Sequence, residues 1–176
     1  MTDAALNPLL IDAPLPYGLP DYRTIAPEHY LPAFEQAFAE HRAEIDALTR
    51  VRSMPTFENT MVAWERSGDL LSRVARTFYT VSSADATAAI QRIEEKLAPL
   101  MTAHEDAILL DSALYWRVKV LHDALDQLGL TAEERYLVER RYREMTHAGA
   151  ALDDEQKERL TELNQRLSVL TTTFEK

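Results

Sequence analysis

The sequence predicts an all-α protein of long antiparallel helices, and three features predict this fold class. Alanine, leucine, glutamate and arginine dominate, and only four of the 176 residues are glycine, a balance that favours helix over strand. Apolar residues recur three and four positions apart along most of the chain, which is the period of an amphipathic helix. No stretch alternates apolar and polar residues in the way that a half-buried strand does.

Residues 1–26 are expected to form an extended arm that packs along the body of the protein. Five of the eight prolines fall in or next to this segment, between Pro8 and Pro27. Proline fixes φ and removes a backbone donor, which favours extended structure. The arm also carries more apolar side chains than a free linker would. Residues 27–176 are expected to form the helical domain itself.

The first helix is expected to begin near Pro27, and it tolerates Pro32 only in or before its first turn. Apolar residues at helical spacing continue through positions 34–48, and the Met-Pro pair at 54–55 breaks the pattern. We therefore expect a long first helix that ends before this pair.

The second helix is expected to start after Thr56, which is a good N-cap residue. Its apolar stripe runs from Phe57 to Val81. Gly68 interrupts the stripe, at a cost of about 1 kcal/mol relative to alanine. We therefore expect one long helix with a weak point at Gly68.

Two further helices are expected between residues 85 and 129. Asp85 is the expected N-cap of the third helix, which Pro99 is expected to kink. Ser112 is the expected N-cap of the fourth helix. Gly129 lies just after the end of that helix, where a left-handed residue is common.

The last two helices carry the clearest start signals. Residues 131–134 (TAEE) form a full capping box for the fifth helix, which Gly149 ends, and Asp153 with Gln156 repeats the box for the sixth. The apolar stripe of the sixth helix runs to the last residues without a glycine or proline to stop it, so we expect the chain to be a C-terminally truncated fragment. The stripe comprises Leu160, Leu163, Leu167, Leu170 and Phe174.

Composition argues against several classes of partner. The formal charge is −10, and lysines and arginines are interspersed among the acids, whereas a nucleic-acid binder carries a basic face. No stretch approaches the roughly 20 apolar residues of a membrane span. The chain has no cysteine, so it can form neither disulfides nor thiolate metal sites. We expect no nucleic-acid or membrane partner, and a cytoplasmic location.

The stretch HEDAI, residues 104–108, contains most of the HExxH zinc-protease motif. That motif needs two imidazoles one helical turn apart on one metal ion, with the glutamate activating water. Ile108 stands in place of the second histidine and cannot bind a metal. His104 lies on the apolar stripe of its helix, so we interpret it as a packing residue and predict no zinc site here.

Other candidate sites are equally incomplete. Glu144 and His147 form one Glu-x-x-His pair, but a di-iron bundle needs a second such pair and two further glutamates. The paired acids at 94–95, 105–106 and 153–154 are interpreted as solvated faces and first-turn charges, because adjacent helical residues point in different directions. We therefore predict no catalytic, cofactor-binding or metal-binding residue in this chain. Five aromatic side chains are interpreted as core, namely Phe34, Phe38, Trp64, Phe78 and Tyr79.

Five stretches in a fixed order resemble a known family. They are NPLL at Asn7–Leu10, LPDYRTIAPEHYLPAFEQAF at Leu19–Phe38, PTFENTMVAWERSGDLLSRV at Pro55–Val74, LAPLMTAHEDAI at Leu97–Ile108 and AGAALDDEQKERLTELNQRLSVLTTTF at Ala148–Phe174. Together they are similar to the N-terminal region of the M3, thimet-oligopeptidase-like, zinc metallopeptidases. Within that family they resemble most the bacterial peptidyl-dipeptidases and next the oligopeptidase A group. Trp64 departs from the pattern, because the family usually shows a smaller aliphatic residue there.

The resemblance implies a two-lobed helical fold with a deep channel, in which this chain forms part of one lobe and of the channel wall. It implies a full-length enzyme that releases C-terminal dipeptides from short peptides, with one zinc ion held by two histidines and a glutamate. A second glutamate would activate the bound water. No position of this chain matches those residues, so the zinc site is expected outside it.

The expected partners follow from the same resemblance. They are short peptides, bound by the full-length channel, and the missing C-terminal catalytic domain in cis. The fragment alone is expected to be inactive and to self-associate through exposed apolar surface.

Two other interpretations stay open. The leucine stripe and the lack of a site also fit a stand-alone helical interaction module without catalytic activity. A helical metal-bundle enzyme has only Glu144 and His147 in its favour. The resemblance also leaves open whether the full protein releases dipeptides or cleaves oligopeptides internally.

Overall fold

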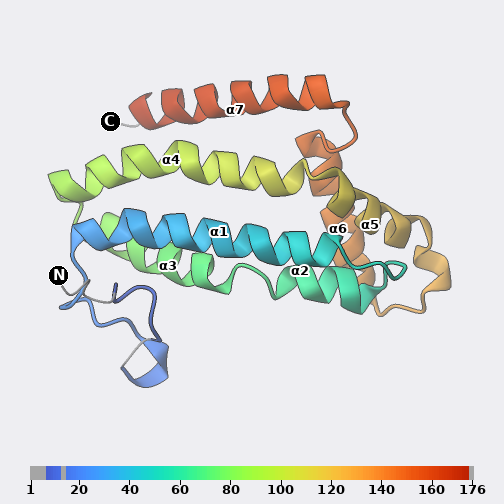
Figure 1. Cartoon of the computed structure of the whole chain (residues 1–176), viewed down its shortest axis with the longest axis horizontal. Helices are drawn as coiled ribbons and strands as arrows, with labels where there is room; N and C mark the ends of the chain where they lie inside the picture. The colour runs from blue at the N-terminus through green and yellow to red at the C-terminus, as the bar shows by residue number, and fades with distance from the viewer. Residues whose placement is uncertain (1–6, 13–14, 175–176) are drawn as a thin grey trace. The chain divides into compact units, whose positions relative to one another are not determined.

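The computed structural model describes residues 7–12 and 15–174, and every regular element in these ranges is helical (Figure 1). The predicted all-α fold class is therefore confirmed. Two short 3₁₀ turns, Pro16–Gly18 and Pro27–His29, precede the first long helix. The α-helices are α1 (Tyr30–Thr49), α2 (Ala63–Glu65), α3 (Asp69–Ala84), α4 (Ala88–Leu109), α5 (Ser112–Asp123), α6 (Ala132–Ala148) and α7 (Asp154–Phe174).

The chain divides into two compact units. The first unit contains the described residues up to His41 together with Gly68–Leu97, and the second contains Arg42–Ser67 and the residues from Ala98 onward. Helices α1 and α4 therefore each supply residues to both units. Each unit has its own buried side chains, and they are described in turn.

An aromatic cluster forms the core of the first unit. Phe34 and Phe78 are fully buried with their ring centroids 5.8 Å apart, and Tyr30 stands edge-on to Phe78 at 5.1 Å. Edge-to-face pairs of this kind contribute about 0.5–1.5 kcal/mol beyond the burial of their area. The predicted aromatic core is confirmed for these side chains and for Phe38, whereas Tyr79 is wrong because its side chain is exposed.

The described part of the N-terminal arm contacts the rest of the first unit. The amide nitrogen Nδ2 of Asn7 donates to the carbonyl oxygen of His29 at 2.8 Å, and the Leu9 side chain is buried. The guanidinium of Arg73 on α3 donates to the carbonyl oxygen of Ile11. The extended arm over residues 1–26 stays a prediction, since positions 1–6 and 13–14 lie outside the described residues.

The second predicted helix is in fact two helices. Thr56 is the cap as predicted, because its Oγ1 accepts from the Asn59 backbone N–H at 3.1 Å while Asn59 Oδ1 accepts from the Thr56 N–H at 2.8 Å. A π-helical turn, Phe57–Val62, leads into α2. Gly68, at φ 75°, precedes α3. A left-handed residue cannot continue a right-handed helix, so the expectation of one long helix was wrong.

Two predicted caps are displaced by one or two residues. Helix α5 is capped by Asp111 and not by Ser112, because Asp111 Oδ1 accepts from the N–H three residues further on at 2.7 Å. At the start of α4, Thr87 Oγ1 accepts from the N–H three residues further on at 3.4 Å, whereas Asp85 ends α3. Helix α4 continues through Pro99, and the kink there stays a prediction.

The start signals of the last two helices are confirmed. Thr131 and Glu134 exchange reciprocal hydrogen bonds of 3.3 Å and 2.8 Å at the start of α6. Gly149 ends this helix with a φ of 104°. Asp153 accepts from the N–H of Gln156 at 2.8 Å at the start of α7.

The core of the second unit lies among α1, the π-helical turn, α2, α4, α5 and α6. Helices α5 and α6 pack against each other, and both contact the π-helical turn. A short 3₁₀ turn, Leu125–Gln127, connects α5 to the loop before α6. The central buried side chains are Ile45, Leu48, Met61, Trp64, Ile108, Leu114, Val118, Leu121, Val138 and Met145.

Helix α7 presents a mostly polar face to the rest of the second unit. Asn164 Nδ2 donates to Asp106 Oδ1 on α4 at 2.9 Å, and Lys157 Nζ donates to Ser112 Oγ at the start of α5 at 2.6 Å. The order of these pairs makes α7 antiparallel to α4. Of the predicted apolar stripe, only Leu160 is half-buried. The exposed members are Leu163, Leu167, Leu170 and Phe174.

Candidate functional site

The HEDAI stretch lies on α4 and does not form a site. His104 is only 3% exposed, and Ile108 is buried in the core of the second unit. Glu105, between them, is exposed. The predicted packing role of His104 and Ile108 is therefore confirmed, and the three side chains do not share one face.

In the second candidate site, Glu144 with His147, the carboxylate of Glu144 is paired with two arginines. Glu144 Oε1 accepts from Arg140 Nε at 2.6 Å, and Oε2 accepts from Arg141 Nη1 at 3.0 Å. Burial alone would raise the pKa of Glu144, but the Arg140 hydrogen bond and both guanidinium charges outweigh it and hold the pKa below its usual value. His147 lies in the last turn of α6, where a helix dipole favours a cation.

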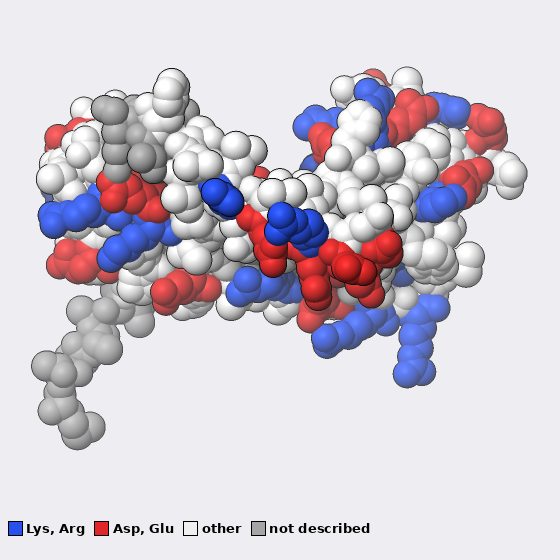
Figure 2. Space-filling model, turned by 90° about the horizontal axis from the view of Figure 1, so that it is seen from above, with Lys and Arg blue, Asp and Glu red and all other residues white. Residues whose placement is uncertain are grey.

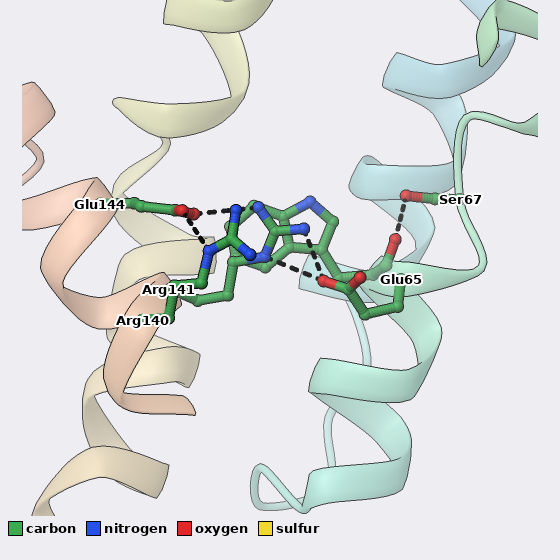
Figure 3. A network of polar contacts seen from close by, with 6 residues as sticks. Glu65, Ser67, Arg140, Arg141 and Glu144 are labelled. Atoms are coloured by element: carbon green, nitrogen blue, oxygen red, sulfur yellow. Dashed lines mark hydrogen bonds and ion pairs between the residues drawn. The ribbon is translucent and has the colours of Figure 1, made fainter. Parts of the chain in front are cut away.

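These arginines belong to a larger cluster, the Arg141 cluster, which comprises Trp64, Glu65, Arg140, Arg141 and Glu144. Figure 3 labels the last four of these residues. Arg141 Nε and Nη2 both donate to Glu65 Oε1, at 2.9 Å and 2.5 Å. Its guanidinium carbon lies 4.6 Å from the centre of the Trp64 ring, within the range of a cation–π contact. The tryptophan that departs from the family pattern is thus buried beneath this arginine and joins α2 to α6.

Arg117 on α5 is a buried arginine without a carboxylate partner among the residues that the structure describes. It is 1% exposed, and its Nη1 donates to the Val51 carbonyl oxygen at 3.1 Å. Nη2 donates to the carbonyl oxygen and to Oδ1 of Asn59, at 3.3 Å and 2.6 Å. Burial lowers the pKa of Arg117. The guanidinium satisfies backbone acceptors in the turn before α2, which is a structural task.

The paired acids differ from one another. Glu94 accepts from Ser82 at 3.0 Å, and Asp153 caps α7. Asp106 is 9% exposed, so its interpretation as part of a solvated face was wrong. Its hydrogen-bond partner Asn164 lies on α7, 58 residues further along the chain. The residues next to Asp106 in the sequence therefore do not reveal that its side chain is buried.

The described residues, 7–12 and 15–174, lack a cluster of metal ligands. No group of three or more histidine, aspartate or glutamate side chains in these ranges is arranged to hold a metal ion. The side chains present there therefore do not fit a zinc site.

The surface charges and the character of the helices concern two kinds of partner, nucleic acid and membrane. Figure 2 shows lysines and arginines beside aspartates and glutamates on the visible face, as the sequence predicts. Within the described ranges, no helix combines the length and the apolar character that crossing a membrane requires.

Sequence reasoning missed the Arg141 cluster, Arg117 and the buried state of Asp106. Each depends on a partner at least 58 residues away: Glu65 lies 76 residues before Arg141, and Asn59 lies 58 residues before Arg117. No local spacing marks such pairs. Only the departure of Trp64 from the family pattern gave a signal, because a larger side chain needs a different neighbour.

Comparison with known proteins gives a consistent result. No protein-family model matches the chain. The chain is 36% identical to the dipeptidyl carboxypeptidase of Escherichia coli (strain K12) over 169 residues, which cover 96% of the chain and 25% of that protein. It is 37% identical to the dipeptidyl carboxypeptidase of Salmonella typhimurium over 168 residues, and 25% identical to oligopeptidase A of the same organism over 168 residues.

The matches therefore cover nearly all of this chain but about a quarter of the length of the curated relatives. The order of similarity, dipeptidyl carboxypeptidase before oligopeptidase A, is the order that the sequence motifs predict. Over this quarter-length segment, the chain is similar to dipeptidyl carboxypeptidases and, at lower identity, to oligopeptidase A, the two groups that the resemblance to the M3 peptidases indicates.

Proposed function

We propose that the chain is the N-terminal helical segment of a zinc-dependent peptidase that releases dipeptides from the C-terminus of short peptides. The observation that carries this proposal is the 36% identity to a dipeptidyl carboxypeptidase across 96% of the chain. The lower identity of 25% to oligopeptidase A favours dipeptide release over internal cleavage. The proposal places the zinc ion and the glutamate that activates its water in the part of the relatives that this chain does not match.

In this proposal the segment acts as scaffold. Its helices form part of the wall of the substrate channel, the catalytic part of the same polypeptide packs against it, and short peptides are the substrates. The Arg141 cluster and Arg117 support the scaffold role, because their donors are directed at acceptors within the same unit. The cytoplasmic location stays a prediction.

The first test is the reading frame beyond the codon for Lys176. We expect several hundred further codons that include an HExxH sequence, because the relatives are about four times as long as the matched segment. A stop codon directly after Lys176 in the native gene contradicts the proposal for this chain.

The second test uses the 176-residue chain itself. After dialysis it is expected to hold no stoichiometric zinc by metal analysis and to cleave no internally quenched peptide, since the residues described contain no group that fits a metal. Tight zinc binding or peptide cleavage by the chain alone would place chemistry in this segment and overturn its assignment as scaffold.

A second candidate function is a stand-alone helical interaction module. The observation that favours it is the outward apolar face of α7, on which Leu167 is 63% exposed and Phe174 92% exposed. Exposed apolar surface of this kind marks a site of protein contact. The reading frame separates the two candidates, because a continued frame with HExxH excludes the module and a stop codon excludes the peptidase.

A further inference from the structure

An open groove of about 670 Å³ runs between the second half of α4 and the first half of α7, within the second unit. Carboxylates outnumber cations along its walls. It is lined by the carboxylates of Asp106, Asp111, Asp154, Glu158 and Glu162 and by one ammonium, that of Lys157. A concave surface with one sign of charge concentrates ligands of the opposite sign.

Asp106 differs from the other acids of the groove because it is buried and one of its oxygens lacks a hydrogen-bond donor among the described residues. Its side chain is nine-tenths buried and lines the groove. Oδ1 accepts the hydrogen bond from Asn164 at 2.9 Å, whereas the buried Oδ2 accepts none from any residue that the structure describes. Burial raises the pKa of this carboxyl. A buried acceptor without a donor carries a free-energy cost, which a bound donor would remove.

The ammonium in the groove is engaged elsewhere. Lys157 Nζ donates to Ser112 Oγ at 2.6 Å, whereas among the described residues Asp106 accepts from Asn164 and not from this ammonium. Asp111 is also engaged, because it caps α5. The wall therefore combines one acceptor that lacks a donor with exposed carboxylates, Glu158 among them.

The occupant that this wall fits is an organic cation and not a metal ion. The acids are distributed along the groove, and in the described ranges no three of them converge as metal ligands do. The apolar side chains of Ala103, Ala107 and Leu110 line the same groove. A charged head on an aliphatic stem matches both features, because the stem packs on apolar surface while the head reaches the carboxylate.

We propose that the α4–α7 groove binds the arginine or lysine side chain of a peptide, with the charged head at Asp106 and the stem along Ala103, Ala107 and Leu110. That the cation comes from a peptide rests on the proposed function. The groove would then favour peptides with a basic residue at one position. It is a binding site, and it takes no part in peptide hydrolysis.

The test is isothermal titration of the 176-residue chain with the peptide acetyl-Ala-Ala-Arg-Ala-Ala-amide at low ionic strength. We expect saturable binding at one site. Asp106→Asn is expected to weaken it about tenfold or more, which is the effect of losing one charge-assisted hydrogen bond. The matched control is Asp46→Asn, which removes the same charge from an exposed residue of α1 and is expected to change the affinity less than about twofold.

Two other ligands test which chemical feature of the ligand the groove recognises. The same peptide with citrulline, which keeps the shape but not the charge, is expected not to bind. Spermidine is expected to compete only weakly, and competition stronger than that of the arginine peptide would overturn the assignment to a peptide side chain. Equal weakening by Asp106→Asn and Asp46→Asn, equal binding of the citrulline peptide, or no binding at all would also overturn the proposal.

A second variant covers the case in which Asp106→Asn disturbs the fold, which circular dichroism will show. Lys157→Met removes a positive charge from the groove wall, which repels a cationic ligand, and is expected to tighten binding of the arginine peptide. An unchanged affinity contradicts the proposal. Failure of the groove is distinguishable from failure of the proposed function. An HExxH-containing reading frame without peptide binding defeats only the groove, and binding with a stop codon after Lys176 defeats only the peptidase.

Discussion

At Asp106, burial and a hydrogen bond act in opposite directions. Burial raises the pKa of the carboxyl, the bond from Asn164 lowers it, and the net pKa is raised above the usual 3.8. The folded chain therefore holds a proton at pH values where the unfolded chain has released it. The stability from this group is complete below pH 3.8 and is lost as the pH rises through the folded pKa.

Asp106→Asn is expected to raise the free energy of unfolding near pH 7 by about 1 kcal/mol, because it removes a buried charge but keeps an acceptor for Asn164. It should also reduce the loss of stability between acidic and neutral pH. Urea unfolding of both proteins across this range measures both effects. The exposed control Asp46→Asn should change stability by less than about 0.5 kcal/mol. A variant less stable than the parent at neutral pH would contradict this account.

Arg117 differs from Asp106, because its buried guanidinium donates to several acceptors. Arg117→Met keeps most of the volume but removes the three hydrogen bonds that the charged guanidinium donates to Val51 and Asn59, so it is expected to lower the free energy of unfolding by roughly 3 kcal/mol. Arg50→Met is the control, because Arg50 is an exposed partner of Asp46 at 2.9 Å and such pairs contribute about 0.5 kcal/mol. Denaturant unfolding should separate the two variants clearly, and equal losses would refute the structural role of Arg117.

The local sequence predicts the role of a residue when that role depends on the pattern of its own helix. It does not predict the role when that depends on a partner from a distant segment of the chain. The packing of His104 and Ile108 followed from the apolar stripe of α4 alone. The burial of Asp106 did not, because it depends on Asn164, and α7 presents to α4 a face that its leucine pattern does not indicate. Arg117 was missed for the same reason.

Among the elements, the break between α2 and α3 depends on one residue. Gly68 has a φ of 75°, and a Cβ added there would meet His41 Cε1 at 2.9 Å. Gly68→Ala is therefore expected to cost about 2–3 kcal/mol, since a left-handed alanine costs about 1 kcal/mol and the imidazole must also move. Gly129→Ala is the matched control, because φ is 62° and no atom lies within 4 Å. Thermal unfolding should show the larger loss for Gly68→Ala, and equal losses would exclude the His41 contact as a cause.

The helix starts show which local signals are strong. The boxes predicted at Thr131 and Asp153 both mark real starts, because two side chains three residues apart must both be suitable. Among the residues predicted as single caps, Thr56 also marks a start. Single caps were less reliable. Asp85 and Ser112 each have a second capping residue close by, and the structure uses Thr87 and Asp111 instead.

At the scale of the whole molecule, composition and period predict the fold class, whereas the division into units depends on contacts between distant segments. Each unit combines two segments of chain, for example Arg42–Ser67 with the residues from Ala98 onward. No linker composition marks these boundaries, because they fall inside or beside helices. The family resemblance placed the catalytic site outside this chain, and this placement stays a proposal.

The outward face of α7 predicts the behaviour of the chain in solution. Leu163, Leu167, Leu170 and Phe174 follow one another at helical spacing and are all exposed. Burial of each such side chain contributes about 1.5–3 kcal/mol, and a second copy offers the same apolar face. We therefore expect the sedimentation coefficient of the chain to rise with protein concentration.

The variant Leu167→Glu with Leu170→Glu is expected to remain monomeric, because it places charges at the centre of this face. Its control is Leu100→Glu with Leu128→Glu, which adds the same charges at exposed apolar positions outside α7 and should self-associate like the parent chain. Sedimentation velocity of the three proteins decides the matter. A parent chain that stays monomeric at every concentration, or a control that dissociates as fully as the α7 variant, would show that this face does not bind a second copy.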